Sequence, residues 1–292
     1  MHSVTIIGIG RVGRALAASL ARAGYRIDAL IVRDGTPEAG SSAELPPELF
    51  VPASFATSIA SDIVFICTQD HEISGAVRML VSMARRGMAV FHTSGALSSE
   101  VLAPLADVGA HTGSIHPLIS ISERAVTDPF HGAYFCVEGD AAAQAIGKTI
   151  AADLGGIPFS IETSKKAAYH AAAVMACGHL VALADAAFSL MEQCGPDAEF
   201  SRRLLLPLVS STIANISAQS TSQALTGPFA RTDVDTIERH LKVLEQSTDT
   251  ELLQIYTALG LRSLDLAIEQ GADKGRAASI RERLLMAERG VR

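Results

Sequence analysis

The stretch Gly8-Ile9-Gly10-Arg11-Val12-Gly13 stands between a short apolar run and an alanine-rich segment near the start of the chain. Residues 3–8 are rich in Val, Ile and Thr, which is typical of a buried parallel strand. Residues 11–23 place apolar side chains at helical spacing, and a glycine ends that helix. Residues 25–32 predict a second strand. The glycines therefore lie where a strand turns into a helix within a βαβ unit.

This context gives each glycine a physical role. Gly8 allows the tight turn, Gly10 lets the backbone approach a pyrophosphate, and Gly13 lets the helix pack on the strand. The phosphates would lie at the helix N-terminus. We therefore expect Gly8, Gly10, Arg11, Val12 and Gly13 to bind a dinucleotide. The alternative is a glycine-rich turn without a ligand, because the six letters alone are a weak signal.

The end of the second predicted strand bears on the choice between NADP and NAD. About twenty residues after such a motif, an NAD site offers an acidic residue to the ribose hydroxyls. If the strand ends at Val32, Arg33 can pair with the 2′-phosphate of NADP. If it ends one residue later, Asp34 serves NAD. We expect NADP, with NAD as the open alternative, and a third reading leaves Arg33 as a solvated loop charge.

The rest of the first half continues the alternation of strands and helices. Strand carboxyl ends border the ligand crevice in an open α/β sheet, so Thr68 and Ser94, which follow two of the strands, are expected near the cofactor. Residues 35–52 are loop-like. Further strands are predicted over 63–67, 88–92, 109–118, 134–137 and 158–161, and helices over 73–84, 98–105 and 141–154. The pattern predicts a doubly wound parallel sheet in an α/β domain over residues 1–162.

The second half is predicted to be all helical, forming a second domain over residues 163–292. Helical spacing extends over 165–192, 200–219, 233–245, 248–270 and 274–288. Residues 165–192 are apolar nearly all round, which is typical of a helix in a domain core or a dimer interface. Many small dehydrogenases join such domains, with the substrate between them. We expect a homodimer built largely by this second domain.

Composition narrows the classes of function. The formal net charge is −7 and the cationic residues are scattered, which argues against a nucleic-acid partner. The four cysteines lie far apart, so we expect free thiols. No apolar run reaches the ~18 residues of a membrane span, and no signal peptide precedes the first strand. These features predict a cytoplasmic protein with a small-molecule partner and no membrane partner.

Four stretches carry a resemblance to a known family: GIGRVGRALA, HTSGALSSEVL, GSIHPL, and KKAAYHAAAVMA followed by LTGPFARTDVDTIERHL. The chain resembles bacterial NAD(P)-dependent oxidoreductases with a Rossmann-like N-terminal domain and a helical C-terminal domain of unknown function. More distantly it is similar to 6-phosphogluconate and β-hydroxyacid dehydrogenases, ketopantoate reductase and pyrroline-5-carboxylate reductase. The resemblance implies the Rossmann-like fold and the cofactor, but no substrate. Where the family tends to carry Asn in the YHAAA helix, this chain reads MACGH over residues 175–179.

The resemblance also implies catalytic residues. Lys166 and His170 are four apart on one helix, so they share a face. Related β-hydroxyacid dehydrogenases place Lys and Asn at this spacing, with Lys as the acid/base and Asn orienting the substrate. By that match Lys166 takes the first role and His170 the second, or His170 donates the proton itself, since its ordinary pKa lies near neutrality. The alternative is a solvated Lys166 and a packed His170.

Three more candidates follow predicted strands. His116 stands before a proline at a strand end and could bind substrate or hold the loop. Ser94 and Gly95 could present a hydroxyl and an amide to a substrate carboxylate, or could form a turn. His111 lies five residues before His116, and odd spacing in a strand puts the two rings on opposite faces. We therefore predict no metal site.

Arg231 follows a Gly-Pro break between two helices. It is a natural clamp for a substrate carboxylate or phosphate, although an ion pair with Asp233 is the plainer interpretation. The sequence thus favours an NADP-dependent oxidoreductase acting on a small anionic metabolite in the interdomain cleft. The alternative is a non-catalytic NAD(P)-binding sensor or partner subunit. Arg33 and the helical second half disfavour a methyltransferase, whose first loop is also glycine-rich.

Overall fold

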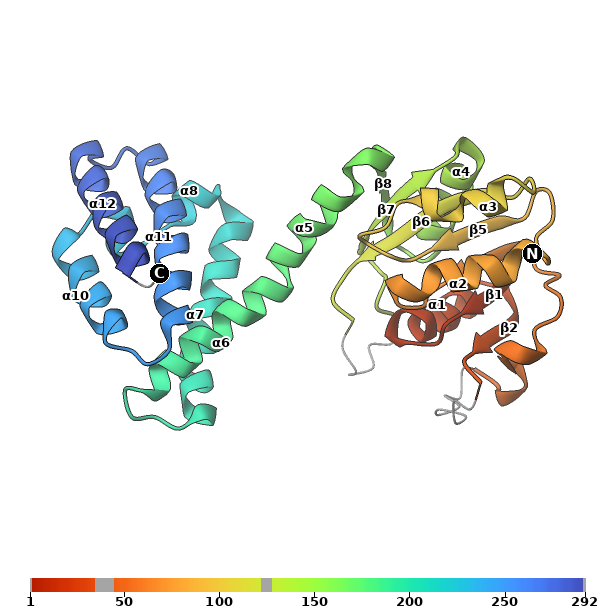
Figure 1. Ribbon diagram of the computed structural model, residues 1–292, viewed down its shortest axis with the longest axis horizontal. Coiled ribbons are helices and arrows are strands. Elements are labelled where there is room, and N and C mark those ends of the chain that lie inside the picture. The colour runs from red at the N-terminus through yellow and green to blue at the C-terminus, as the bar shows by residue number, and fades with distance from the viewer. Residues whose placement is uncertain (1, 35–44, 122–127, 291–292) are drawn as a thin grey trace. The chain divides into compact units, whose positions relative to one another are not determined.

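The computed structural model of the chain describes residues 2–34, 45–121 and 128–290 (Figure 1). Contacts divide the chain into two compact units, Met1–Cys177 and Gly178–Arg292. The first unit therefore extends 15 residues beyond the predicted boundary at residue 162. It includes helix α5 (Lys166–Ala176), whose first side chain is buried and hydrogen-bonded to the sheet. Each unit is described by itself below.

An eight-stranded sheet forms the first unit, in the order β3-β2-β1-β4-β5-β6-β7-β8. The strands are β1 (Ser3–Ile7), β2 (Arg26–Val32), β3 (Phe50–Pro52), β4 (Ile63–Ile66), β5 (Ala89–His92), β6 (His111–Leu118), β7 (Tyr134–Gly139) and β8 (Ile157–Ser160). The predicted doubly wound α/β fold is confirmed, with two differences. Strand β3 lies in a segment predicted as loop, of which residues 35–44 fall outside the described residues. Strands β6 and β7 pair antiparallel, because no helix crosses over in the described part of their connection.

Helices cover both faces of this sheet (Figure 1). On one face lie α1 (Arg11–Arg22) and α4 (Ala141–Asp153), and on the other α2 (Asp70–Val81), η3 (Ser99–Leu102) and α3 (Ala103–Ala106). Successive residues of β4 divide between the two cores, as the period of two in a strand requires. Phe65 packs on the side of α1 and Ile66 on the side of α2. In both cores, apolar side chains of the helices pack against those of the strands. This packing holds the strands, and therefore their ends, in place.

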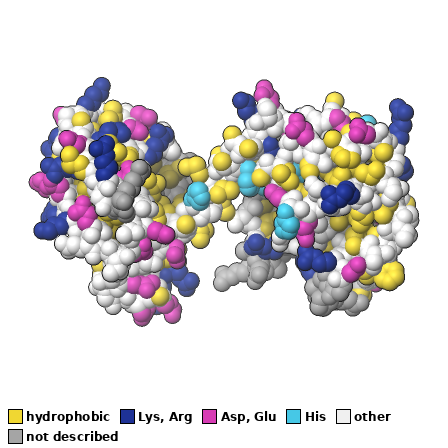
Figure 2. All heavy atoms as spheres, in the orientation of Figure 1, with side chains coloured by type: hydrophobic (Ala, Val, Ile, Leu, Met, Phe, Trp, Pro, Cys, Tyr) yellow, Lys and Arg dark blue, Asp and Glu magenta, His cyan; other side chains and the backbone are white. Residues whose placement is uncertain are grey.

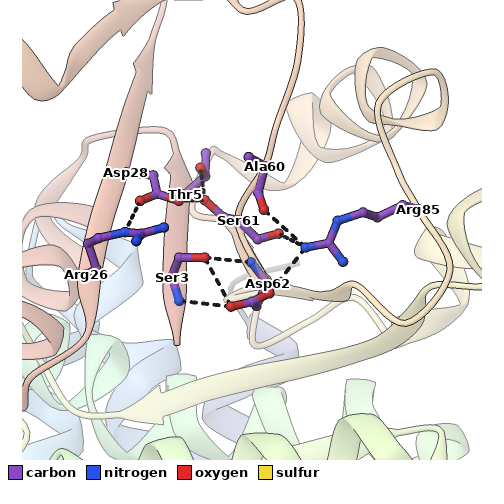
Figure 3. Close-up of polar contacts among 8 residues, drawn as sticks. All are labelled: Ser3, Thr5, Arg26, Asp28, Ala60, Ser61, Asp62 and Arg85. Carbon is purple, nitrogen blue, oxygen red and sulfur yellow. Dashed lines mark hydrogen bonds and ion pairs between the residues drawn. The ribbon is translucent and has the colours of Figure 1, made fainter. Parts of the chain in front are cut away.

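The amino ends of β1, β2 and β4 carry a closed network of polar contacts (Figure 3). The Asp62 carboxylate accepts bonds from the backbone N–H (3.2 Å) and hydroxyl (3.1 Å) of Ser3 and pairs with Arg85 (3.2 Å). The hydroxyl of Ser61 donates to Asp28 at 2.7 Å. The pKa of Asp62 lies below its ordinary value, chiefly because of the backbone bond from Ser3.

The second unit is helical throughout its described residues, as predicted. Its helices are α6 (Gly178–Glu192), α7 (Ala198–Ala218), α8 (Thr221–Ala224), α9 (Gly227–Ala230), α10 (Val234–Glu245), α11 (Thr250–Glu269) and α12 (Lys274–Gly290). The core joins α10, α11 and α12 through side chains such as Ile237, Leu264 and Ile280. Asp233 begins α10 by accepting the backbone N–H of Thr236 at 3.1 Å.

The long apolar pattern over residues 165–192 divides at Cys177 into α5 and α6. By length and composition alone, Thr163–Glu192 is apolar enough to cross a membrane, which corrects the expectation that no segment reaches that length. Its many alanines and few charged residues make this segment apolar. However, α5 is tied into the first unit through Lys166, while α6 contacts α7 and α11. No residue of α6 is fully buried, although Ala186 and Leu190 are partly buried and pack against the core of the second unit.

Candidate functional site

The carboxyl ends of β1, β2 and β4 frame a cavity of about 630 Å³ in the first unit. Gly8, Gly10, Arg33 and Thr68 are among the residues that line it, so the structure brings these four predicted residues together. Arg11 and Val12 are not among the lining residues, and the Arg11 guanidinium donates to the Ile121 carbonyl at 3.2 Å. Arg14, a cationic residue that also lines the cavity, was not among the predicted residues.

The three glycines differ in what surrounds them. Gly8 has a φ of +92°, and a Cβ there would lie 2.8 Å from the backbone N of Thr68. A Cβ at Gly13 would overlap the carbonyl oxygen of Gly8, so helix and strand meet only without it. At Gly10, just before α1, a Cβ would have no heavy atom within 4 Å. Gly8 and Gly13 therefore serve the fold, whereas Gly10 leaves open space at the helix N-terminus.

Thr68 supplies a second sign that this cavity suits a polar ligand. Its hydroxyl is buried and has no hydrogen-bond partner among the described residues. Buried hydroxyls are normally paired, so such an atom calls for a ligand or another explanation. Open space at Gly10, the first amides of α1 and this hydroxyl together fit a dinucleotide phosphate group.

Arg33 and Asp34, the two residues that bear on the choice between NADP and NAD, differ in their contacts. Strand β2 ends at Val32, and Arg33 follows with 76% of its side chain exposed. Its guanidinium forms an ion pair with Glu72 of α2, which also lines the cavity. Asp34 instead accepts bonds from the backbone N–H and hydroxyl of Ser54, both at 3.0 Å, and does not line the cavity.

A row of polar side chains crosses the sheet beside this cavity. His92, Ser114 and Glu138 lie opposite one another on β5, β6 and β7 and face the same side. The Lys166 ammonium donates to the Ser114 hydroxyl at 2.6 Å, and that hydroxyl lies 3.3 Å from the Ser94 carbonyl oxygen, to which it donates. Lys166 is only 2% exposed, so it is not the solvated residue that the alternative interpretation expected.

Burial sets the proton affinity of this cluster. It lowers the pKa of Lys166, and interactions with Cys136, Glu138 and Asp70 oppose that shift in part. His92 has its pKa lowered to about 4, by burial first and by the Lys166 charge second. Its Nδ1 accepts the Ser94 N–H at 3.2 Å, so its Nε2–H donates to the Ser98 carbonyl, also at 3.2 Å. His92 is therefore neutral near pH 7, and both of its ring nitrogens form hydrogen bonds within the protein.

Two other histidines converge on Gly95. The rings of His116 and His170 stand almost perpendicular, with centroids 5.9 Å apart. A Cβ at Gly95 would lie 2.8 Å from His116 Nε2 and would clash with His170 Nδ1, so only glycine allows this approach. His116 Nδ1 contacts the Tyr169 hydroxyl at 2.7 Å. The His170 Nδ1 atom is buried without a partner among the described residues.

The same cluster lowers the basicity of His116. Its pKa falls to about 4 because of burial, with the Lys166 charge as the next cause. The ring is thus neutral near pH 7. Burial also raises the pKa of Tyr169, so its hydroxyl keeps its proton.

The amide and hydroxyl of Ser94 form hydrogen bonds within the turn that follows β5. Its amide donates to His92, and its hydroxyl accepts the backbone N–H groups of Ala96 (3.1 Å) and Leu97 (3.0 Å). The turn interpretation therefore accounts for these contacts without a substrate. Gly95 allows the close approach of two imidazoles, and the role of its amide as a donor to a substrate stays a prediction.

Four residues of this cluster were not predicted from the sequence: Ser114, Glu138, His92 and Tyr169. Tyr169 was accessible, because Lys166, Tyr169 and His170 follow the i, i+3, i+4 spacing of one helix face. Ser114 shares a strand face with His116, two residues on. Glu138 and His92 carried no local signal, since they join the cluster through strand pairing.

The remaining predicted residues lie apart from this cluster. Arg231 is an exposed residue of the second unit, and its clamping role stays a prediction. It helps to lower the pKa of Asp233, although the bonds from Thr236 come first. His111 Nδ1 lies 3.7 Å from Asp140. Within the described ranges, no group of three or more His, Cys, Asp or Glu residues is arranged to hold a metal.

Two family profiles match the chain. One, described as a Rossmann-like domain, matches residues 1–117, and the other, described as a domain of unknown function (DUF2520), matches residues 133–263. The chain therefore joins a Rossmann-like domain to a DUF2520 domain, and the resemblance inferred from its motifs is confirmed. A search of curated proteins gives no match.

Several solved structures share the fold over nearly their whole length. A candidate NADP oxidoreductase from Bacteroides fragilis is 22% identical, with a TM-score of 0.72 over 90% of this chain and 98% of that chain. A Thermotoga maritima protein is 26% identical, with a TM-score of 0.71 over 91% and 99%. A pyrroline carboxylate reductase from Plasmodium falciparum, with NADP bound, is 13% identical, with a TM-score of 0.56 over 91% and 98%.

Proposed function

We propose that this chain, a Rossmann-like domain joined to a DUF2520 domain, is an NADP-dependent oxidoreductase of a small anionic metabolite. One observation carries the proposal. The Lys166 amine is buried against Ser114 at the carboxyl edge of the sheet, the same edge that holds the glycine cradle, by which we mean residues 8–13. Hydride transfer to a carbonyl or imine requires a proton donor at the developing alkoxide or amine. A buried amine beside a dinucleotide cavity is suited to that task.

Strand order supports this pairing of cradle and amine. Thr68 follows β4, Ser94 follows β5, and Ser114 lies on β6, and these strands are consecutive neighbours. Adjacent strands lie about 4.8 Å apart, so Ser114 lies roughly 10 Å across the sheet from Ile66, the last residue of β4, two residues before Thr68. Both groups belong to the first unit. The bound cofactor would supply the hydride, and this chain's residues would hold and move the proton.

Each side chain of the cluster then has a role. Lys166 donates or accepts the proton, and Ser114 orients its amine. His170, whose buried Nδ1 has no partner among the described residues, orients the substrate. His116, neutral and held by Tyr169, contributes a second ring nitrogen beside Gly95. We also propose that the substrate is negatively charged. This part of the proposal rests on the predicted role of Arg231, which is to bind a carboxylate or phosphate of the substrate.

The preference for NADP rests on Arg33. It follows the last residue of β2 and lines the cavity, whereas Asp34 is held by Ser54. The Plasmodium reductase of the same fold has NADP bound, which supports the same choice. NAD remains the alternative cofactor.

Titration calorimetry with NADP and NAD tests the cofactor. We expect NADP to bind more tightly, and Arg33→Ala to weaken NADP about tenfold while leaving NAD unchanged, because one charge-assisted bond to the 2′-phosphate is lost. Arg78→Ala is the matched control, since Arg78 is an exposed residue of α2 outside the cavity wall. Equal affinities that neither variant changes would overturn the NADP proposal.

A second function, a non-catalytic NAD(P)-binding sensor or partner subunit, is favoured by one observation. Lys166 is 2% exposed and its hydrogen bond is satisfied inside the protein. NADPH oxidation in the presence of small keto acids, with and without amines, separates the two. Turnover that disappears in Lys166→Met supports the enzyme. NADPH binding without turnover across the panel supports the sensor.

We propose a homodimer through α6 and α7. These helices expose apolar side chains such as Val181 (67%) and Leu208 (62%), and Figure 2 shows hydrophobic side chains at the surface over α6. Exposed apolar surface of this kind is typical of an interface. Light scattering should give twice the chain mass at micromolar concentration and a monomer for Leu208→Glu. Phe55→Glu, an equally exposed apolar site in the first unit, should leave the mass unchanged.

A further inference from the structure

We propose that Glu138 is a positioning residue for Lys166: its buried carboxylate anchors the start of α5 and provides the negative charge beside the amine. This inference rests on the proposed function in so far as Lys166 transfers the proton. Its physical content, control of the Lys166 amine by Glu138, is independent of turnover. Three observations carry it: the bonds to the carboxylate, its register on the sheet, and the charges around the amine.

The Glu138 carboxylate ties three elements together. It accepts bonds from the backbone N–H and the hydroxyl of Ser99, both at 2.8 Å, and from the hydroxyl of Thr163 at 3.1 Å. Ser99 begins η3, and Thr163 begins η4 (Thr163–Lys165). The chain passes directly from η4 into α5, whose first residue is Lys166. The carboxylate therefore fixes the point from which the Lys166 side chain enters the sheet.

Strand register brings the same carboxylate next to the partner of the amine. Glu138 on β7 lies opposite Ser114 on β6, and paired residues point to the same face. Ser114 accepts the bond from Lys166 at 2.6 Å. Glu138 and Lys166 are 0% and 2% exposed, so their charges interact with little screening by water.

Among the titratable groups around the Lys166 amine, few besides Glu138 carry a charge near pH 7. The titratable groups that face Lys166 are Cys136 and Glu138 on β7, Asp70 at the start of α2, His92 on β5, His116 on β6 and Tyr169 on α5. Both histidines have pKa values of about 4, and Tyr169 and Cys136 have raised pKa values, so these four are neutral near pH 7. Asp70 is exposed to water. Glu138 is the fully buried carboxylate among them, and its charge favours the ammonium form of Lys166.

The test follows the titration of Lys166 itself. The chain has only five lysines, so lysine labelled with ¹³C at Cε gives a resolvable NMR spectrum, and Lys166→Met identifies the Lys166 signal. Glu138→Gln keeps the shape and removes the charge. We expect the Lys166 pKa to fall by about one unit or more in this variant, as loss of a nearby opposite charge requires. Glu162→Gln, the same change at an exposed position, should leave it unchanged.

A second variant tests the anchoring separately. Thr163→Val removes one bond to the carboxylate and keeps the charge, so it should raise the rate at which acetic anhydride modifies Lys166 relative to the other lysines. An unchanged Lys166 pKa in folded Glu138→Gln overturns the electrostatic half of the proposal. An unchanged modification rate in Thr163→Val overturns the anchoring half, even if Glu138→Gln does not fold.

These outcomes are separable from the proposed function. The titration is made on the protein without cofactor or substrate. If Glu138→Gln shifts the Lys166 pKa while Lys166→Met retains full turnover, the oxidoreductase roles are wrong and the control of the amine by Glu138 stands.

Discussion

The two edges of the sheet in the first unit treat polar side chains differently. At the amino edge, Asp62 is paired with Ser3 and Arg85, and Ser61 is paired with Asp28 (Figure 3). At the carboxyl edge, the Thr68 hydroxyl and His170 Nδ1 are buried without partners among the described residues. Thr68 follows β4, whose amino end carries Asp62, so one strand bears both kinds of side chain, whereas His170 lies on α5.

The difference separates polar groups that stabilise the fold from those that await a ligand. A buried group left unpaired costs about 1–3 kcal/mol, whereas a paired one contributes about 1 kcal/mol net. The carboxyl edge is therefore less stable than the same edge would be with apolar side chains. A bound dinucleotide or substrate would supply the missing partners. This contrast makes opposite predictions for matched substitutions at the two edges.

The largest expected effect is on turnover. Lys166→Met keeps the stem of the side chain and removes its proton and charge, so turnover should fall ~10²–10⁴-fold, the usual contribution of a positioned acid. Cofactor affinity should change little, because Lys166 does not line the dinucleotide cavity. The melting temperature should fall, because the buried Glu138 carboxylate loses the positive charge beside it. Lys165→Met, at the exposed neighbour, is the control. Steady-state kinetics that fall equally in both variants would contradict the role of Lys166.

The next largest effect is on cofactor affinity, and it distinguishes Gly10 from Gly13. Gly10→Val has open space on the protein side, so we expect an unchanged melting temperature and a loss of cofactor affinity of at least about a hundredfold, since the side chain occupies the pyrophosphate position. Gly13→Val meets the Gly8 carbonyl and should lower the melting temperature instead. Calorimetry and thermal unfolding of both variants check this division. Tight cofactor binding by Gly10→Val would break it.

The glycine cradle could be predicted from sequence because its signals are local: strand, turn and helix follow one another within 25 residues. The pair Lys166 and His170 was likewise accessible from helical spacing. The register that sets Glu138 opposite Ser114 was not, because it depends on an antiparallel pairing that a parallel pattern does not anticipate. The contact of α5 with the first unit could not be predicted either, because it depends on a bond between residues far apart in the sequence. The apolar pattern of α5 places it with the helices that follow and does not reveal the bond from Lys166 to Ser114, 52 residues earlier.

A smaller effect is expected at the amino edge. Asp62→Ala removes the acceptor of the Ser3 and Arg85 bonds and should lower the free energy of unfolding by about 1–1.5 kcal/mol, because the carboxylate is half exposed and water screens its ion pair. Cofactor affinity should not change, since Asp62 does not line the dinucleotide cavity. Urea unfolding and calorimetry measure the two quantities. A variant that loses affinity in proportion to stability would contradict the separation of the two edges.

The smallest and sharpest effect comes from one substitution made at both edges. Thr5 is buried at the amino edge and its hydroxyl contacts Ser61 at 2.8 Å, whereas the buried hydroxyl of Thr68 has no partner among the described residues. Thr5→Val should therefore lower the free energy of unfolding by about 1 kcal/mol and leave cofactor affinity unchanged.

Thr68→Val should do the reverse. Removal of an unpaired buried hydroxyl leaves the free energy of unfolding equal or higher by up to about 1 kcal/mol, while loss of one bond to the cofactor lowers its affinity about threefold to tenfold. Urea unfolding without cofactor and calorimetry with it give all four values. If Thr68→Val destabilises the protein as Thr5→Val does, its hydroxyl is paired in solution and the carboxyl edge is not waiting for a ligand there. Opposite signs would show that the Thr68 hydroxyl is kept for binding at the expense of stability.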